Sequence, residues 1–183
     1  MWLNSEQQLR KKLRLSGYDY KTPGYYFVTL CTNHRMCLFG DIIHNEMNLN
    51  SAGKMIEIAW SEISKHYFNW KVDSLIIMPN HVHAIIFLSE KLMVDSELGQ
   101  GSAPTISLPE LIRNLKSYTM KIYSEGVRTK NWPMFEKHLW QRNYYEHIIR
   151  DEPSLIKIRE YIINNPAGWE KDQHNPNKVL FGV

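Results

Sequence analysis

Two histidines separated by one residue are the first sign of chemistry in this sequence. His81 and His83 fall within residues 81–88, whose β-branched and aromatic side chains predict a strand. Alternate side chains of a strand point to one face, so the two imidazoles stand side by side at a spacing suited to one metal ion, while Val82 enters the core. Paired histidines also occur on strands that bind nothing, and the pattern alone leaves both interpretations open.

The rest of the sequence narrows the kind of metal site. No Cys-x-x-Cys or His-Glu-x-x-His spacing accompanies the pair, which disfavours a structural zinc site and a zincin protease. Oxygen ligands are then expected beside the imidazoles. A mixed nitrogen and oxygen set with open positions suits Mg²⁺ or Mn²⁺ acting on a phosphate, so the combination favours phosphoryl transfer.

The second candidate stretch is a helix predicted to begin at Asp151 and to end shortly before Pro166. Its apolar stripe consists of Leu155, Ile158 and Ile162. Tyr161 and Asn165 lie one turn apart on a face beside that stripe. The tyrosine could face a cleft, or it could pack while the asparagine caps the helix, and periodicity leaves both interpretations open.

Two further tyrosines compete for the role of nucleophile. Tyr144 and Tyr145 lie beside Arg142 and His147 in a polar, aromatic stretch. Aromatic rings with cationic neighbours commonly hold single-stranded nucleic acid by stacking on its bases. We therefore interpret this stretch as one that structures the site or stacks on DNA.

The pattern around these stretches predicts an α+β fold. The predicted strands are residues 24–32, 72–78 and 81–88, with Pro79-Asn80 as a tight turn between the last two. The earlier predicted helices are residues 52–67, with Ser51 as N-cap, and a helix from the capping box Ser107-Leu108-Pro109-Glu110 to about Tyr123. Residues 89–105 are predicted to be a loop. The order β-α-β-β-α, then a further helix, indicates an antiparallel sheet with helices packed on one face.

Length and composition predict one soluble domain over residues 1–183. The hydrophobic fraction is 43% and the charged fraction 22%, as in globular proteins. No apolar run approaches the roughly 20 residues of a membrane span, and no secretory signal is visible. Cys31 and Cys37 are too few to suggest a disulfide framework. We expect a cytoplasmic protein without disulfides.

The positive charge is unevenly distributed. A formal net charge of +3 permits nucleic-acid binding without demonstrating it. One basic cluster lies in an N-terminal arm, residues 1–20, and consists of Arg10, Lys11, Lys12 and Arg14. A second consists of Arg113, Lys116, Lys121, Arg128 and Lys130. Each cluster could follow a phosphate backbone or be solvated surface charge.

Several motifs, taken in order, resemble one bacterial family. The most informative are Met78-Pro79-Asn80-His81-Val82-His83 and Tyr161-Ile162-Ile163-Asn164-Asn165-Pro166. Similar stretches occur at residues 14–20, 24–29, 37–40, 116–117 and 140–150. The set spans about residues 10–170 and resembles the REP-associated tyrosine transposases of the HUH single-tyrosine, IS200-like superfamily.

The resemblance implies a ferredoxin-like, RRM-like sheet with the histidine pair on a central strand. His81 and His83 would bind Mg²⁺ or Mn²⁺, and Tyr161 would attack a DNA phosphate to leave a 5′-phosphotyrosine and a free 3′-hydroxyl. Asn165 matches the third metal ligand, where relatives generally have the longer glutamine, and water could replace it. A phenol of pKa near 10 is a poor nucleophile at neutral pH, so Lys157 and the ion are expected to supply positive potential.

The implied substrate is single-stranded DNA folded into hairpins of short repetitive palindromes. The covalent link conserves the bond energy, so no nucleotide cofactor is expected. We expect phosphate contacts from the N-terminal cluster, Arg113, Lys116 and Arg142. The connection over residues 123–151 looks long enough for Tyr161 to return to its own histidines, which favours a monomer acting in cis. Tail residues 171–183 have no predicted role.

Two other functions stay open at this point. A non-catalytic module that binds single-stranded DNA hairpins would not need a metal ion or Tyr161. A metal-dependent nuclease with an activated water as nucleophile would cleave DNA without becoming attached to it.

Overall fold

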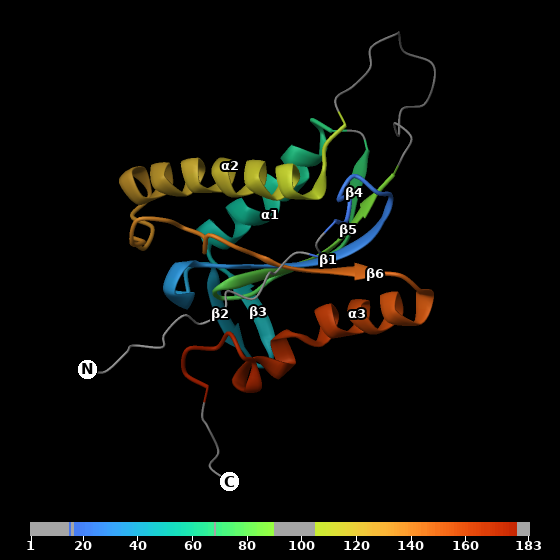
Figure 1. Ribbon diagram of the computed structural model, residues 1–183. Coiled ribbons are helices and arrows are strands. Elements are labelled where there is room, and N and C mark those ends of the chain that lie inside the picture. Colours follow the sequence, from blue (N-terminus) through green and yellow to red (C-terminus); the bar gives the residue numbers. More distant parts are fainter. Residues whose placement is uncertain (1–14, 16, 68, 90–104, 179–183) are drawn as a thin grey trace, which may run out of the picture.

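A computed structural model describes residues 15, 17–67, 69–89 and 105–178. Its centre is a four-stranded antiparallel sheet with strand order β4-β5-β1-β6 (Figure 1). The strands are β1 (Gly24–Cys31), β4 (Trp70–Ile77), β5 (His81–Leu88) and β6 (Tyr145–Ile149). The histidine pair therefore lies on a central strand, and the predicted α+β class is confirmed.

The remaining elements of the described residues are a hairpin, three helices and two short 3-10 helices. The hairpin pairs β2 (Gly40–Ile43) with β3 (Glu46–Leu49). The helices are α1 (Ser51–Ser64), α2 (Leu108–Thr129) and α3 (Glu152–Asn164). The 3-10 helices are η1 (Asn33–Arg35) and η2 (Pro166–Lys171). Among the helices of the described residues, none combines the length and the apolar character needed to cross a membrane.

Helices cover both faces of the sheet, with α1 and α2 on one side and α3 on the other (Figure 1). Along β1, Val28 and Leu30 enter the main core, whereas Phe27 points to the opposite face. The smaller core under α3 consists of Phe27, Ile85, Ile149, Leu155 and Ile162. The expectation of helices on one face thus holds for α1 and α2 but not for α3. The central strands carry apolar side chains on both faces, and each face needs cover.

The helix starts follow local capping chemistry. In α1 the N-cap is Asn50, whose Oδ1 accepts from Gly53 N at 2.9 Å. The predicted N-cap, Ser51, lies one residue inside the helix and accepts from Trp132 Nε1 at 2.7 Å. The capping box that opens α2 is present as predicted. That helix continues past its predicted end at Tyr123 to Thr129, through Gly126, which is buried against Trp132.

The turn between β4 and β5 places the first histidine. Met78 N donates to His81 O at 2.8 Å, so the strand pairing closes immediately around Pro79 and Asn80. The backbone carbonyl of Asn80 also accepts from Thr32 N at 2.8 Å, which ties the turn to the end of β1. The predicted tight turn between antiparallel strands is therefore confirmed.

A bulge in β4 fixes the position of α3. The register of β4 against β5 shifts between Val72 and Ser74, which leaves Asp73 outside the regular ladder. The Asp73 carboxylate accepts two hydrogen bonds from Arg159 of α3, from Nε at 2.9 Å and from Nη2 at 2.6 Å. This forked ion pair holds α3 against the sheet, at the point where β4 lies opposite Ile85 and Ile86 of β5.

Some sequence predictions concern residues that the structure does not describe. The N-terminal basic cluster lies outside the described residues, and so does most of the predicted loop over residues 89–105. Its members are Arg10, Lys11, Lys12 and Arg14. Cys31 and Cys37 are both described and are free thiols, as predicted.

Candidate active site and metal centre

The two histidines lie side by side on the face of β5 that α3 covers. His81 is opposite Cys31 and His83 is opposite Thr29 in the register with β1. Their ring centroids are 4.5 Å apart, and their exposed fractions are 0% and 2%. The sequence prediction that both imidazoles share one face is therefore met, and the pair is far more buried than a chance surface pair.

Each imidazole uses its Nδ1 atom for a hydrogen bond away from the site. Asn80 Oδ1 lies 2.9 Å from Nδ1 of His81, and Thr29 Oγ1 lies 2.8 Å from Nδ1 of His83. This arrangement leaves both Nε2 atoms for the site, as in histidines whose outer hydrogen bond orients them for a metal ion. Burial lowers the pKa of His81 to about 3 and that of His83 to about 2. Both rings are therefore neutral at physiological pH and carry a free lone pair.

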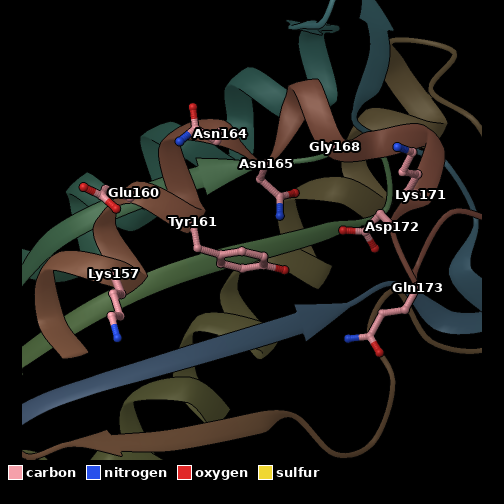
Figure 2. A pocket seen from close by; sticks show the side chains of 9 residues that line it. All are labelled: Lys157, Glu160, Tyr161, Asn164, Asn165, Gly168, Lys171, Asp172 and Gln173. Atoms are coloured by element: carbon pink, nitrogen blue, oxygen red, sulfur yellow. The ribbon is translucent and has the colours of Figure 1, made fainter. Parts of the chain in front are cut away.

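Tyr161 of α3 reaches the same site. Its hydroxyl lies 3.2 Å from His83 Nε2, and its ring packs edge-on against Phe27. The side chain is 45% exposed, because it borders a pocket of about 510 Å³ formed by α3, η2 and the segment after η2. In Figure 2 the Tyr161 hydroxyl, the Asn165 amide and the Asp172 carboxylate turn toward one space. The tyrosine therefore faces a cleft and is not simply a packed core residue.

The described residues do not activate the phenol of Tyr161. Burial is the first cause of a raised Tyr161 pKa and the carboxylate of Asp172 is the second, while a hydrogen bond with Asn165 works in the opposite direction. Lys157 lines the same pocket one turn earlier but does not reverse this balance (Figure 2). The expectation that Lys157 helps to activate the nucleophile is thus not supported by the metal-free site.

Two buried polar atoms at this site have no hydrogen-bond partner among the described residues. They are Nε2 of His81 and Oδ1 of Asn165, whose residues are 0% and 5% exposed. Unpaired buried polar atoms are costly, and a cluster of them suggests a missing ligand. Asp172 adds a carboxylate, and one ligand atom from each of His81, His83 and Asp172 lies within 4.8 Å of the others. Two neutral imidazoles with amide and carboxylate oxygens fit Mg²⁺ or Mn²⁺.

The segment after η2 contributes two side chains to the site that sequence reasoning missed. Asp172 belongs to the possible ligand set, and the ring centroid of His174 lies 4.7 Å from that of His81. Both residues lie in the tail for which no role was predicted. Their spacing of two residues repeats that of the histidine pair, but no predicted element indicated that the chain turns back after Pro166.

The rival tyrosines lie near the site without reaching the histidines. Tyr145 of β6 pairs with Thr29, which places it on the same face as His83 but two strands away. Its ring is 52% exposed and contacts Phe27 edge-on. Tyr144 packs instead against the main core on the other face. Tyr161 is therefore the tyrosine that the described structure brings to the histidine pair.

The basic residues proposed for DNA contact have different surroundings. Lys116 Nζ donates to the carbonyl oxygens of Gln141 and Asn143, at 2.9 and 3.0 Å, and so holds the chain that leads into β6. Arg113 and Arg142 are exposed. Their contacts with phosphate stay predictions, as do those of the N-terminal cluster.

Comparison with known proteins identifies the family. Residues 21–165 match the family model for IS200-like transposases, and the chain belongs to that family. A Haemophilus influenzae protein without an assigned function is 39% identical over 171 residues, which cover 90% of this chain and 92% of that protein. Another Haemophilus influenzae protein, named as a REP-associated tyrosine transposase, is 25% identical over 160 residues, 84% of this chain and 77% of that protein.

A solved structure supports the fold assignment. It is a REP-associated tyrosine transposase bound to a REP hairpin, with a TM-score of 0.54 and 18% identity over 84% of this chain and 72% of that one. At this level of identity the likeness concerns the fold. Together with the family match, it confirms the resemblance that the ordered motifs indicated and supports a transposase-like role.

Proposed function

We propose that this protein cleaves and rejoins single-stranded DNA, with Tyr161 as nucleophile and a divalent metal ion bound by His81 and His83. The observation that carries the proposal is the meeting of the Tyr161 hydroxyl and His83 Nε2 at 3.2 Å. Beside this contact lie the unpaired atoms His81 Nε2 and Asn165 Oδ1. Asn165 and Asp172 are the proposed oxygen ligands.

In the proposed reaction the phenolic oxygen of Tyr161 attacks a backbone phosphorus. The new bond joins that oxygen to the 5′-phosphate, the bond to the 3′-oxygen breaks, and the departing oxygen takes a proton to become a 3′-hydroxyl. Attack of a second 3′-hydroxyl on the phosphotyrosine reverses these steps and rejoins the DNA. The number of phosphodiester-type bonds is unchanged throughout, so no nucleotide cofactor is required.

The electrostatics of the site favour a cation for this reaction. Burial and Asp172 both raise the pKa of Tyr161, so the phenol needs a positive charge nearby to lose its proton near neutral pH. When bound, Mg²⁺ or Mn²⁺ would supply that charge and polarise the phosphate oxygens. His81 and His83 are held neutral by burial and therefore need not release a proton before they bind the ion.

The proposed substrate is a single-stranded DNA hairpin. The fold relative of known structure was bound to a REP hairpin, and the family match makes the same class of partner reasonable for this chain. Arg113, Arg142 and the N-terminal cluster are the proposed phosphate contacts, and the exposed ring of Tyr145 suits stacking on a base. A DNA substrate of this kind places the activity in the cytoplasm.

The decisive experiment incubates the protein with labelled hairpin DNA and Mn²⁺ and then separates the products by denaturing electrophoresis. Wild type should give a protein-linked DNA band together with a free 3′-hydroxyl fragment. Tyr161→Phe should give neither, and so should the double variant His81→Ala, His83→Ala. Tyr118→Phe is a matched control, because Tyr118 is 40% exposed on α2 and lies away from the site.

The alternatives predict different results in the same experiment. Cleavage by wild type without a linked band, persisting in Tyr161→Phe, would indicate a nuclease with an activated water. Hairpin binding that survives both chelation and Tyr161→Phe, with no cleavage across a panel of hairpins, would indicate a binding module.

A further inference from the structure

Asn80, which immediately precedes the histidine pair, makes an unusual number of contacts for one side chain. It is fully buried, and its Nδ2 donates to two backbone carbonyls, Arg35 O at 2.9 Å and His174 O at 2.8 Å. Its Oδ1 lies 2.9 Å from Nδ1 of His81. One amide group therefore joins η1, the segment after η2 and the first histidine.

The orientation of this amide follows from its partners. Both neighbours of one terminal atom are carbonyl oxygens, which only accept hydrogen bonds, so that atom must be the NH₂ group. The other terminal atom is then the oxygen, which only accepts, and the hydrogen bond must come from His81 Nδ1. A neutral imidazole with a proton on Nδ1 has its lone pair on Nε2. That Nε2 atom is the buried, unpaired atom that faces the site.

We infer that Asn80 is a positioning residue that fixes His81 in the tautomer with a proton on Nδ1 and ties the segment carrying Asp172 to the same histidine. The inference deepens the proposed function, because it concerns the same metal site. Asn80, the residue before the His-x-His pair, would thus accept the outer hydrogen bond that orients a metal-binding histidine.

The second half of this inference rests on the anchoring of residues 172–174. Asn80 holds the carbonyl of His174, and Arg35 Nη1 donates to the carbonyl of Gln173 at 2.7 Å. Asp172 Oδ1 accepts from the backbone N–H of His174 at 2.6 Å, so the carboxylate is held by the same short segment. Loss of the Asn80 amide should therefore loosen both His81 and Asp172.

The other natural side chains of similar size cannot reproduce this arrangement. Aspartate at position 80 would still accept from His81 Nδ1 but would face two carbonyl oxygens without a proton to donate. Leucine would fill the space and leave His81 free to carry its proton on either nitrogen. These two variants therefore separate the effect on the histidine from the effect on the segment around Asp172.

Asn69 provides a matched control. It is another buried asparagine, 5% exposed, and its amide also joins distant backbone groups. Its Nδ2 donates to Ile106 O at 3.1 Å, and its Oδ1 accepts from Ile106 N at 3.0 Å. Asn69→Leu should destabilise the fold for similar reasons without touching the site.

The test begins with ¹⁵N NMR of the histidine rings in metal-free wild type near pH 8. His81 should show a protonated Nδ1 and an unprotonated Nε2. In Asn80→Asp this pattern should persist, whereas in Asn80→Leu a substantial share of His81 should carry the proton on Nε2. A wild-type ring with its proton on Nε2 would overturn the inference, even if the Asn80 variants failed to fold.

Manganese affinity, measured by calorimetry without DNA, is the second readout. Asn80→Leu should weaken Mn²⁺ binding roughly 10- to 100-fold, as expected for an outer hydrogen-bond partner of a metal ligand. Asn80→Asp should show a smaller loss, and Asn69→Leu should stay within about twofold of wild type. Equal Mn²⁺ affinities in Asn80→Leu and Asn69→Leu would show that Asn80 stabilises the surrounding loops without positioning the metal ligands.

These measurements use neither DNA nor catalysis, so they stand apart from the proposed function. The predicted tautomer and affinities combined with no DNA-linked band would leave the inference intact and refute only the strand-transfer proposal.

Discussion

The Nε2 atom of His83 is where the proposed nucleophile and the proposed ion meet. Without a metal ion this nitrogen is hydrogen-bonded to the Tyr161 hydroxyl at 3.2 Å. It is also the nitrogen that His83 would offer as a ligand, because Nδ1 is engaged with Thr29. The phenol and the ion therefore compete for one nitrogen atom.

This competition predicts that Tyr161→Phe binds Mn²⁺ at least as tightly as wild type. Removal of a hydrogen bond worth about 0.5–1.5 kcal/mol should strengthen binding by roughly twofold to tenfold, although we expect the variant to be inactive. Calorimetric titration with Mn²⁺ measures the effect. A clear loss of affinity would instead mean that the phenolic oxygen is itself a ligand.

Asp172 is expected to affect both the Tyr161 pKa and metal binding, and one substitution tests both effects. Asp172→Asn removes the charge that raises the pKa of Tyr161, so the Tyr161 pKa in the metal-free protein should fall. Mn²⁺ binding should weaken by more than the roughly 10- to 100-fold that is typical of a change in an outer hydrogen-bond partner.

Ultraviolet titration of Asp172→Asn, with Tyr161→Phe as the reference that lacks this phenol, gives the Tyr161 pKa. An unchanged Tyr161 pKa together with an unchanged Mn²⁺ affinity would show that Asp172 acts neither on the phenol nor as a metal ligand.

Local periodicity predicted which faces the candidate residues occupy, whereas their proposed roles came from the resemblance of the ordered motifs to the family. His81 and His83 share a face because strand side chains alternate, and Tyr161 leaves the apolar stripe because helix faces repeat. Asp172 could not be found this way, since its position depends on contacts made by Arg35 and Asn80, far away in the sequence. Only the folded chain brings these groups together.

At the scale of elements, the site depends on how α3 lies across the sheet. Tyr161 is two residues after Arg159, whose guanidinium is bound to the bulge at Asp73. The ion pair and its hydrogen bonds hold the pKa of Asp73 below its usual range. The contact couples the register of β4 to the position of Tyr161.

Arg159→Ala should therefore affect both stability and reaction. We expect a small loss in the free energy of unfolding, because the pair is partly exposed, and slower formation of the DNA-linked band. Arg128→Ala is the control, because it breaks an exposed pair with Glu125 on α2. Urea unfolding and single-turnover kinetics measure the two effects. Equal reaction rates in the two variants would show that the pair does not position Tyr161.

The elements that sequence reasoning missed are the short ones. The hairpin of β2 and β3 has four-residue strands, and its turn uses His44 and Asn45 at positive φ without a glycine. The sequence of β6 is largely polar because it is an edge strand, and only its last residue, Ile149, is buried. β5 was predicted with the bounds that the structure has, and α2 was predicted except for its last turns, because burial fixes the apolar pattern of both elements.

At the scale of the whole molecule, the structure brings Tyr161 to the histidines of its own chain. This geometry favours the predicted cis arrangement, and mixing variants tests it. Tyr161→Phe combined with the double variant His81→Ala, His83→Ala should give no DNA-linked band. Recovery of the band would show that one subunit supplies the tyrosine and another the histidines.

Stability should fall on mild acidification. His81 and His83 have pKa values of about 3 and 2 in the folded protein, against about 6.5 when unfolded. At pH values between the folded and the unfolded pKa, the unfolded chain binds more protons than the folded chain. The free energy of unfolding therefore decreases as the pH drops below about 6.5. Each histidine contributes up to roughly 1.4 kcal/mol per pH unit in that window.

Urea unfolding of the metal-free protein at pH 7.5 and pH 5 tests this expectation. The double variant His81→Gln, His83→Gln should show a smaller change between the two pH values than wild type. The pKa of His174 is also lowered by burial, so some dependence should persist. If the free energy of unfolding changed equally in wild type and in the double variant, the lowered pKa values of His81 and His83 would be contradicted.

The closing of the site by residues 172–174 has a consequence for synthesis of the protein. Cys31 on β1 meets His174 across 143 positions of sequence, so the site gathers groups from both ends of the described chain. A nascent chain not yet translated as far as Asp172 would hold both histidines and Tyr161 without this proposed ligand. The proposed metal site could therefore be completed only after residues 172–174 had left the ribosome and packed against Arg35 and Asn80.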